Sequence, residues 1–96
     1  MAQIICHHEG RYNIYHTVSD GFSYSSSLDL DELKAEIKEQ FGNNGLSVLE
    51  ARLERAHANG HSGKSGGSLD GFLCCNRAGE KEARLTTEQC IAQFLS

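Results

Sequence analysis

The segment NGHSGKSGGS, residues 59–68, contains the letters GKS that also end the phosphate-binding motif G-x-x-x-x-G-K-[ST]. In that motif a strand precedes the glycine-rich loop and a helix follows it, so that free amide groups of the helix bind the phosphates. Here Ala58 stands in place of the first glycine, a helical pattern precedes the motif, and two glycines follow it. We therefore interpret residues 60–67 as a solvated Gly/Ser loop and not as a nucleotide site.

Cysteine and histidine side chains could together hold a metal ion. Cys6 and His8 would share one face of a strand. Cys74 and Cys75 are adjacent further along the chain. Zinc takes four nitrogen or sulfur ligands, usually in pairs two to four residues apart, and the sequence contains no C-x-x-C or H-x-x-x-H. We therefore expect no metal or other cofactor, and keep these four residues as an alternative metal-binding or thiol-dependent site.

A catalytic Cys–His pair is compatible with the composition, because either of the adjacent cysteines could meet His8 or His16 in the fold. No nucleophile elbow or comparable signature surrounds these cysteines. The carboxylates of residues 29–39 fit the caps and the solvated face of one amphipathic helix better than they fit a catalytic pair. We expect a protein without enzymatic activity.

Two surfaces could instead bind a protein partner. Acidic side chains line the predicted helix 30–41, and such a face would steer association with a basic partner. Tyr15 lies opposite Ile14 on a predicted sheet face of Ser, Thr and Asn, where an exposed tyrosine supplies contact area. The loop 60–67 adds some positive charge. The candidate partner-binding residues are Asp31, Glu32, Glu36, Glu39, Tyr15, His61 and Lys64.

The first thirty residues alternate apolar and polar side chains with the period of strands. The predicted strands are 3–8, 12–18 and 22–28. For the second turn, a three-residue loop 19–21 brings the apolar sides together, with Gly21 in the left-handed position. The resulting pairs are Val18–Phe22, His16–Tyr24 and Tyr12–Leu28. The first turn, around Glu9-Gly10, could follow the same scheme, and a two-residue loop is nearly as good.

Three helices follow, each marked by a capping box in which Asp, Ser or Thr is followed three residues later by Glu or Gln. The boxes are Asp29 with Glu32, Ser47 with Glu50, and Thr86 with Gln89. The predicted helices are 30–41, 47–58 and 87–95. Gly42 and Gly60 end the first two. The segment 68–79 favours a short helix over 69–77 capped by Ser68, although FLCC within it also fits a strand.

Composition and charge exclude several classes of protein. With 96 residues, 39% of them hydrophobic and 23% charged, the chain suits one folded domain with a small core. Residues 1–50 carry three basic and eight acidic side chains, and residues 51–96 carry six basic and five acidic ones, for a net charge of −4. This balance argues against direct nucleic-acid binding. Without a membrane-length apolar run or a signal peptide, we expect a cytoplasmic protein with reduced cysteines.

We expect a single α+β domain over residues 1–96. Residues 1–28 would form a three-stranded antiparallel β-meander, and residues 29–96 would form three to four helices that pack on one face of the sheet. The expected core consists of Ile4, Ile14, Val18, Phe22, Leu28, Leu33, Ile37, Phe41, Leu49, Leu53, Phe72, Ile91 and Phe94.

A small, mildly acidic chain without a catalytic signature is typical of accessory proteins of bacteria and their phages. The leading hypothesis is therefore a non-enzymatic protein-binding module, such as a phage- or mobile-element-encoded inhibitor or regulator of a host complex. A module that binds a small ligand between the sheet and the loop 60–68 is the other alternative. The sequence leaves open whether the protein is a monomer or a homodimer.

Overall fold

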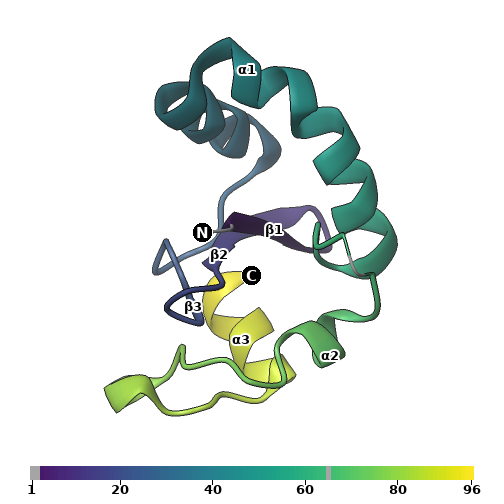
Figure 1. Ribbon diagram of the computed structural model, residues 1–96. Coiled ribbons are helices and arrows are strands. Elements are labelled where there is room, and N and C mark those ends of the chain that lie inside the picture. The colour runs from purple at the N-terminus through teal and green to yellow at the C-terminus, as the bar shows by residue number, and fades with distance from the viewer. Residues whose placement is uncertain (1–2, 65) are drawn as a thin grey trace.

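The chain forms three strands followed by helices, in a computed structural model that describes residues 3–64 and 66–96. The elements are β1 (Gln3–His8), β2 (Arg11–His16), β3 (Gly21–Phe22), α1 (Leu30–Asn59), α2 (Leu69–Phe72), a 3-10 turn η1 (Glu80–Glu82) and α3 (Thr87–Phe94). The strands pair antiparallel in the order β1-β2-β3. The expected α+β class and the three-stranded antiparallel sheet are confirmed (Figure 1).

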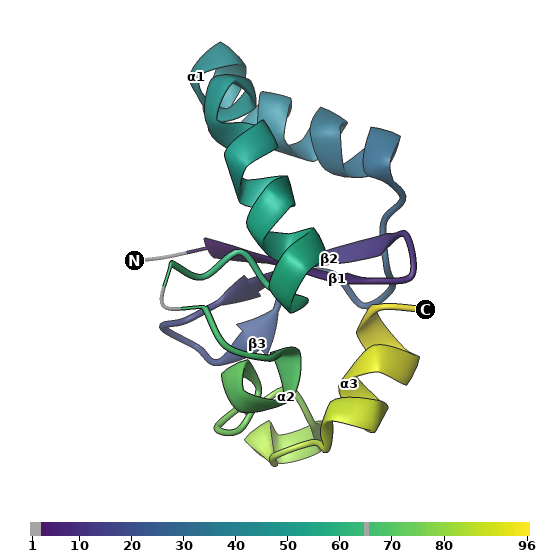
Figure 2. The same ribbon diagram turned by 90° about the vertical axis from the view of Figure 1, so that its right-hand side faces the viewer.

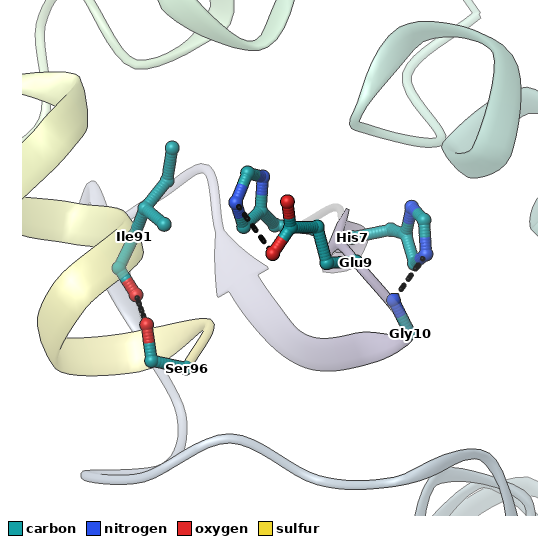
Figure 3. A network of polar contacts seen from close by, with 6 residues as sticks. His7, Glu9, Gly10, Ile91 and Ser96 are labelled. Atoms are coloured by element: carbon teal, nitrogen blue, oxygen red, sulfur yellow. Dashed lines mark hydrogen bonds and ion pairs between the residues drawn. The ribbon is translucent and has the colours of Figure 1, made fainter.

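The first hairpin has a two-residue turn. His8 pairs with Arg11, which leaves Glu9 and Gly10 between the strands. Both turn residues have positive φ, 47° and 80°, as a tight type I′ turn requires. The His7 ring closes the turn, because its Nε2 accepts a hydrogen bond of 3.0 Å from the Gly10 amide (Figure 3). The three-residue scheme for this turn is wrong.

The second hairpin differs from the predicted register. Tyr15 pairs with Phe22, so the loop runs over residues 17–20, and Asp20 adopts the left-handed conformation with φ 55° in place of Gly21. The predicted pairing of Val18 with Phe22 is wrong. A register change by an odd number moves every side chain to the opposite face. Phe22 therefore joins the face of Tyr15, and Val18 lies in the turn with 71% of its surface exposed.

The predicted third strand is shorter than expected because a side chain takes over part of its pairing. Tyr12 and Leu28 exchange both backbone hydrogen bonds, as predicted. Between them, the buried Asn13 amide donates to the Tyr24 carbonyl at 2.9 Å and to the Phe94 carbonyl at 3.0 Å. Its oxygen accepts from the backbone amide next to it on β2. Asn13 thus joins β2 to the 24–28 segment and to the end of α3.

Helix α1 is broken at Gly42, where the backbone is not helical, with φ 63° and ψ −154°. The break divides α1 into a first arm, residues 30–41, and a second arm, residues 43–59, as Figure 1 shows. The capping box of Asp29 and Glu32 is confirmed, and so is the end at Gly60 in the left-handed conformation. The predicted cap at Ser47 is wrong, since its hydroxyl donates to the Asn44 carbonyl within the helix.

The C-terminal elements are tied together by short polar contacts. Ser68 caps α2, which ends at Phe72 and is shorter than the predicted 69–77. Beyond it the buried Asn76 amide donates to the carbonyls of Leu73 and Leu85, which organises the chain without a helix. The capping box of α3, Thr86 with Gln89, is confirmed. At its other end the Ser96 hydroxyl donates to the Ile91 carbonyl at 2.8 Å (Figure 3).

Helices cover both faces of the sheet, so the predicted packing on one face is wrong. One face carries Ile5, Tyr12 and Ile14 and packs against the two arms of α1. The opposite face carries Cys6 and Tyr15 and packs against the α2 and α3 region. Figure 2 shows α1 on one side of the sheet and α2 with α3 on the other.

Two predicted core residues are exposed as a consequence of the turns around them. Val18 lies in the hairpin loop, and Phe41, next to the Gly42 break, is 46% exposed. Within the described ranges, no helix is both long enough and apolar enough to cross a membrane.

Candidate binding groove

A groove of about 660 Å³ lies between the second arm of α1, the beginning of β1 and the segment after Gly60. Its lining residues are Gln3, Ile4, Val48, Ala51, Arg52, Arg55, Ser62 and Lys64. This volume is in the range of ligand sites in proteins. The groove is therefore the first place to look for a binding function.

Helical spacing places one wall of the groove. Val48, Ala51, Arg52 and Arg55 recur at steps of three and four residues, which puts them on one face of the second arm. The Arg52 guanidinium donates to the Gln3 carbonyl at 2.9 Å. The Arg55 guanidinium donates to the Ser62 carbonyl at 2.8 Å. Both arginines are thus held in place by backbone oxygen atoms on the opposite side of the groove.

The second wall is an extension of the sheet. The Ser62 amide donates to the Ile5 carbonyl at 2.9 Å, and the Ser62 hydroxyl accepts from the Ile5 amide at 2.9 Å. The His7 amide donates to the Gly60 carbonyl, and Cys6 forms an isolated antiparallel bridge with His61. The prediction of a solvated loop over residues 60–67 is therefore wrong for its first part, because residues 61–63 are buried beside β1.

His61 is buried within this wall. The side chain is 1% exposed and stacks on Phe72, with ring centroids 4.4 Å apart. Its Nδ1 accepts a hydrogen bond from the Gly63 amide at 3.1 Å, and burial lowers its pKa below the ordinary value. A neutral ring with its proton on Nε2 fits the contact at Nδ1, and the buried Nε2 has no hydrogen-bond partner among the described residues. Of the two loop residues predicted to contact a partner, His61 is therefore buried, whereas Lys64 is exposed on the rim of the groove.

The charge of the groove is one-sided. Among the described residues that line it, three are cationic and none carries a carboxylate. Among the described residues, ion pairs join His8 to Glu9 and Arg77 to Glu82. None of these four residues lines the groove. Burial, and then the charge of Arg55, lower the pKa of Arg52. An anionic group in the groove would relieve the repulsion between the two guanidinium groups.

The groove also offers apolar surface, and the side chain of one lining residue holds a buried oxygen without a hydrogen bond. Ile4, Val48 and Ala51 line it, and Val48 is 53% exposed to water. The side-chain oxygen of Gln3 is buried without a hydrogen-bond partner. A buried acceptor of this kind normally has a donor. The cationic and apolar lining therefore suits a ligand that combines an acidic group with an apolar part.

The predicted acidic surface is partly occupied by contacts within the protein. A carboxylate oxygen of Glu32 accepts from the Asp29 amide in the capping box. Glu36 accepts from the Tyr24 hydroxyl at 2.7 Å, and burial together with this contact raises the pKa of Tyr24 to about 12. Asp31 and Glu39 are exposed. Tyr15, predicted to be exposed, is only 2% exposed, because the α2 and α3 region covers its face.

The cysteines and histidines do not assemble into one site. Cys6 is fully buried beside Cys90, and burial raises its pKa well above the ordinary value. Cys74 and Cys75 are exposed. No group of three His, Cys, Asp or Glu side chains in residues 3–64 and 66–96 is placed to hold a metal ion.

The histidines named for a catalytic pair have other contacts. The Nε2 atom of His8 lies 3.8 Å from a carboxylate oxygen of Glu9. His16 is hydrogen-bonded to the Ser23 hydroxyl. Hydrogen bonds of the described residues join neither histidine to Cys74 or Cys75. The contacts of the described residues therefore pair His8 with a carboxylate and His16 with a hydroxyl.

Comparison of the chain with protein-family models, with curated proteins and with solved structures gave no match. The function is therefore inferred from the groove itself.

Most of the groove residues escaped the sequence analysis, with Lys64 as the exception. The available signal was the second arm, in which Val48, Ala51, Arg52 and Arg55 form one apolar and basic face without a carboxylate. The contribution of β1 and Ser62 could not be seen, because it depends on the segment after Gly60 pairing with β1.

Proposed function

We propose that the protein is a non-enzymatic binding module that holds an acidic, partly apolar segment of a protein partner in the groove. The observation that carries the proposal is the cluster of Arg52, Arg55 and Lys64 around an apolar floor, with no carboxylate among the described lining residues. Arginine beside apolar surface is a common source of binding energy at protein interfaces. The proposal keeps the protein-binding class expected from the sequence and moves the contact surface from the acidic arm to the groove.

A chain segment suits the groove better than a small molecule does. Small-molecule sites bury most of their ligand, whereas this groove is open enough to leave half of the Val48 surface in water. A peptide can place a carboxylate beside the guanidinium groups and lay an apolar side chain on Val48. An inhibitory or regulatory role would follow if this segment belongs to a working surface of the partner.

The test is selection of peptides from a displayed random library on the immobilised protein. We expect the selected peptides to be enriched in Asp or Glu next to an apolar residue. Their affinity should fall about 10- to 100-fold in the double variant Arg52→Gln/Arg55→Gln, because loss of desolvated charge pairs costs about 1.4 to 3 kcal/mol.

A matched control separates this site from general charge. The variant Arg77→Gln/Arg84→Gln removes two exposed guanidinium groups outside the groove, and it should bind the selected peptides as the parent does. Lys64→Gln changes an exposed rim residue and tests the groove without removing the contacts of Arg52 and Arg55. Selected peptides without an acidic excess, or equal loss in both double variants, would refute the proposal.

A further inference from the structure

Cys74 and Cys75 form an exposed pair of thiols between α2 and the 3-10 turn η1. Their sulfur atoms are 3.6 Å apart, and both side chains face solvent, whereas Cys6 and Cys90 are buried. The backbone around the pair is fixed from two sides. The Arg84 guanidinium donates to the Cys74 carbonyl at 2.6 Å, and the side-chain amide of the buried Asn76 donates across the pair to the Leu73 carbonyl at 2.7 Å.

The distance between the sulfur atoms fits one bridging atom better than a direct bond. A disulfide needs its sulfur atoms about 2.05 Å apart, so they would have to approach by about 1.5 Å. An atom that forms bonds of about 2.3 Å to both sulfur atoms at the observed 3.6 Å would have a sulfur–atom–sulfur angle of about 103°. This angle is close to that of tetrahedral and pyramidal centres.

We propose that Cys74 and Cys75 are a dithiol site for a thiol-seeking metalloid or soft metal ion with two open positions, of which trivalent arsenic is the representative. Soft thiolate ligands select soft ions. In the described part of the chain, no third His, Cys, Asp or Glu completes a metal cage around the pair. The site therefore suits an arsenic(III) compound or soft metal ion that forms two bonds to sulfur and keeps a third substituent that the protein does not supply.

The reaction needs no oxidant. With a monosubstituted arsenic(III) oxide, two As–S bonds form and the As–O bond breaks. The two thiol protons leave with the oxygen as one molecule of water, and arsenic remains trivalent. The hydrogen bond with Cys74 and the charge on that neighbour raise the pKa of Cys75, while the Arg84 charge opposes this shift. The Cys75 proton is thus held more tightly than in a free thiol, and it leaves as the As–S bond to that sulfur forms.

The experiment treats the full chain with phenylarsine oxide and follows intact mass. We expect one adduct, lighter by one water than the sum of the reactants, that survives a large excess of a monothiol and is released by a small dithiol. Cys74→Ser and Cys75→Ser should each give an adduct that the monothiol removes. Cys90→Ser should behave as the parent, because that thiol is buried on the sheet.

Two results would overturn the proposal. One is an adduct on the parent that the monothiol removes as easily as it does from the Cys74→Ser variant. The other is a stable adduct in either single variant, which would place the arsenical elsewhere. The same treatment in urea distinguishes sequence from fold. If the fold positions the two sulfur atoms for binding, the folded chain should retain the arsenical longer than the unfolded chain. Equal retention would show that the fold does not contribute to binding.

Discussion

Buried polar side chains carry much of the specificity of this fold. Asn13 is fully buried, and its amide links β2 to the backbone of Tyr24 and Phe94, which lie far apart in the sequence. An apolar residue at this position would leave those carbonyls without a donor, and each unsatisfied buried group costs about 1–3 kcal/mol.

Replacement of Asn13 by leucine should therefore lower the free energy of unfolding by about 3 kcal/mol. Urea denaturation followed by circular dichroism measures the change. Gln93→Leu, at an exposed position of α3, is the matched control and should stay within about 0.5 kcal/mol of the parent. Equal midpoints for the two variants would show that the Asn13 contacts are not needed for stability.

His61 should make stability depend on pH. Burial lowers the pKa of its ring, while the carbonyls of Gly66 and Gly67 act in the opposite direction. Below the ordinary pKa of about 6.5, the unfolded chain therefore binds more protons at this residue than the folded chain does. The contribution of His61 to the free energy of unfolding should be retained completely above about pH 6.5. It should be lost progressively as the pH falls below that value.

The measurement compares urea denaturation of the parent and of His61→Phe between about pH 7 and pH 5. Phenylalanine keeps a flat ring on Phe72 and cannot take up a proton. The variant should lose less stability over this interval than the parent. His7, whose pKa is also lowered by burial and by nearby histidines, is present in both proteins and contributes equally. Identical pH slopes would exclude His61 as the responsible group.

At the scale of elements, α1 depends on the conformation of one glycine. Gly42 lies at φ 63° and ψ −154°, a region that only glycine adopts readily. The break lets the two arms of α1 pack Leu33 and Leu49 into the same core above the sheet. Gly42→Ala should lower the free energy of unfolding by about 1–3 kcal/mol.

Thermal or urea denaturation measures this change, and Gly71→Ala provides the control. Gly71 lies in α2 without a positive φ, and a methyl group there would meet the Ser68 hydroxyl at an ordinary 3.5 Å. We expect this control to be neutral or slightly stabilising. If both alanine variants have the stability of the parent, the break does not require glycine.

The elements that the sequence predicted well are those with local signals. The boxes of Asp29 with Glu32 and of Thr86 with Gln89, the cap at Ser68 and the end at Gly60 all involve residues within a few positions of one another. Ser47 shows the limit of such signals. The same motif occurs there, but the helix has already begun after Gly42, so the serine hydroxyl bonds within the helix.

The register of the second hairpin depended on one loop length. Asp20 can take a left-handed conformation, and once it does, the loop is one residue longer than the glycine at position 21 suggests. Phe22 then turns to the face of Tyr15, and that face becomes apolar enough to be covered by α2 and α3. The alternation of apolar and polar residues along one strand does not determine the length of the loop that follows it. The buried position of Tyr15 could therefore not be predicted from the sequence pattern.

At the scale of the whole molecule, both faces of the sheet are used for packing, and the groove remains as a concave, cationic surface beside its edge. The protein has a net charge of −4, yet three cationic side chains gather there. Like charges repel, so this arrangement favours a ligand that brings negative charge. The acidic arm and the groove therefore make opposite predictions about where a partner binds.

The measurement that separates them is a two-dimensional NMR titration of the labelled protein with an acidic peptide selected from the random library. The account predicts that the largest changes fall on the methyl groups of Ile4 and Val48 and on the Nε–H signals of Arg52 and Arg55. Signals of Asp31 and Glu39 should stay in place. Changes that gather instead on the first arm of α1, or that leave the groove signals unmoved at saturation, would contradict the assignment of the groove as the binding site.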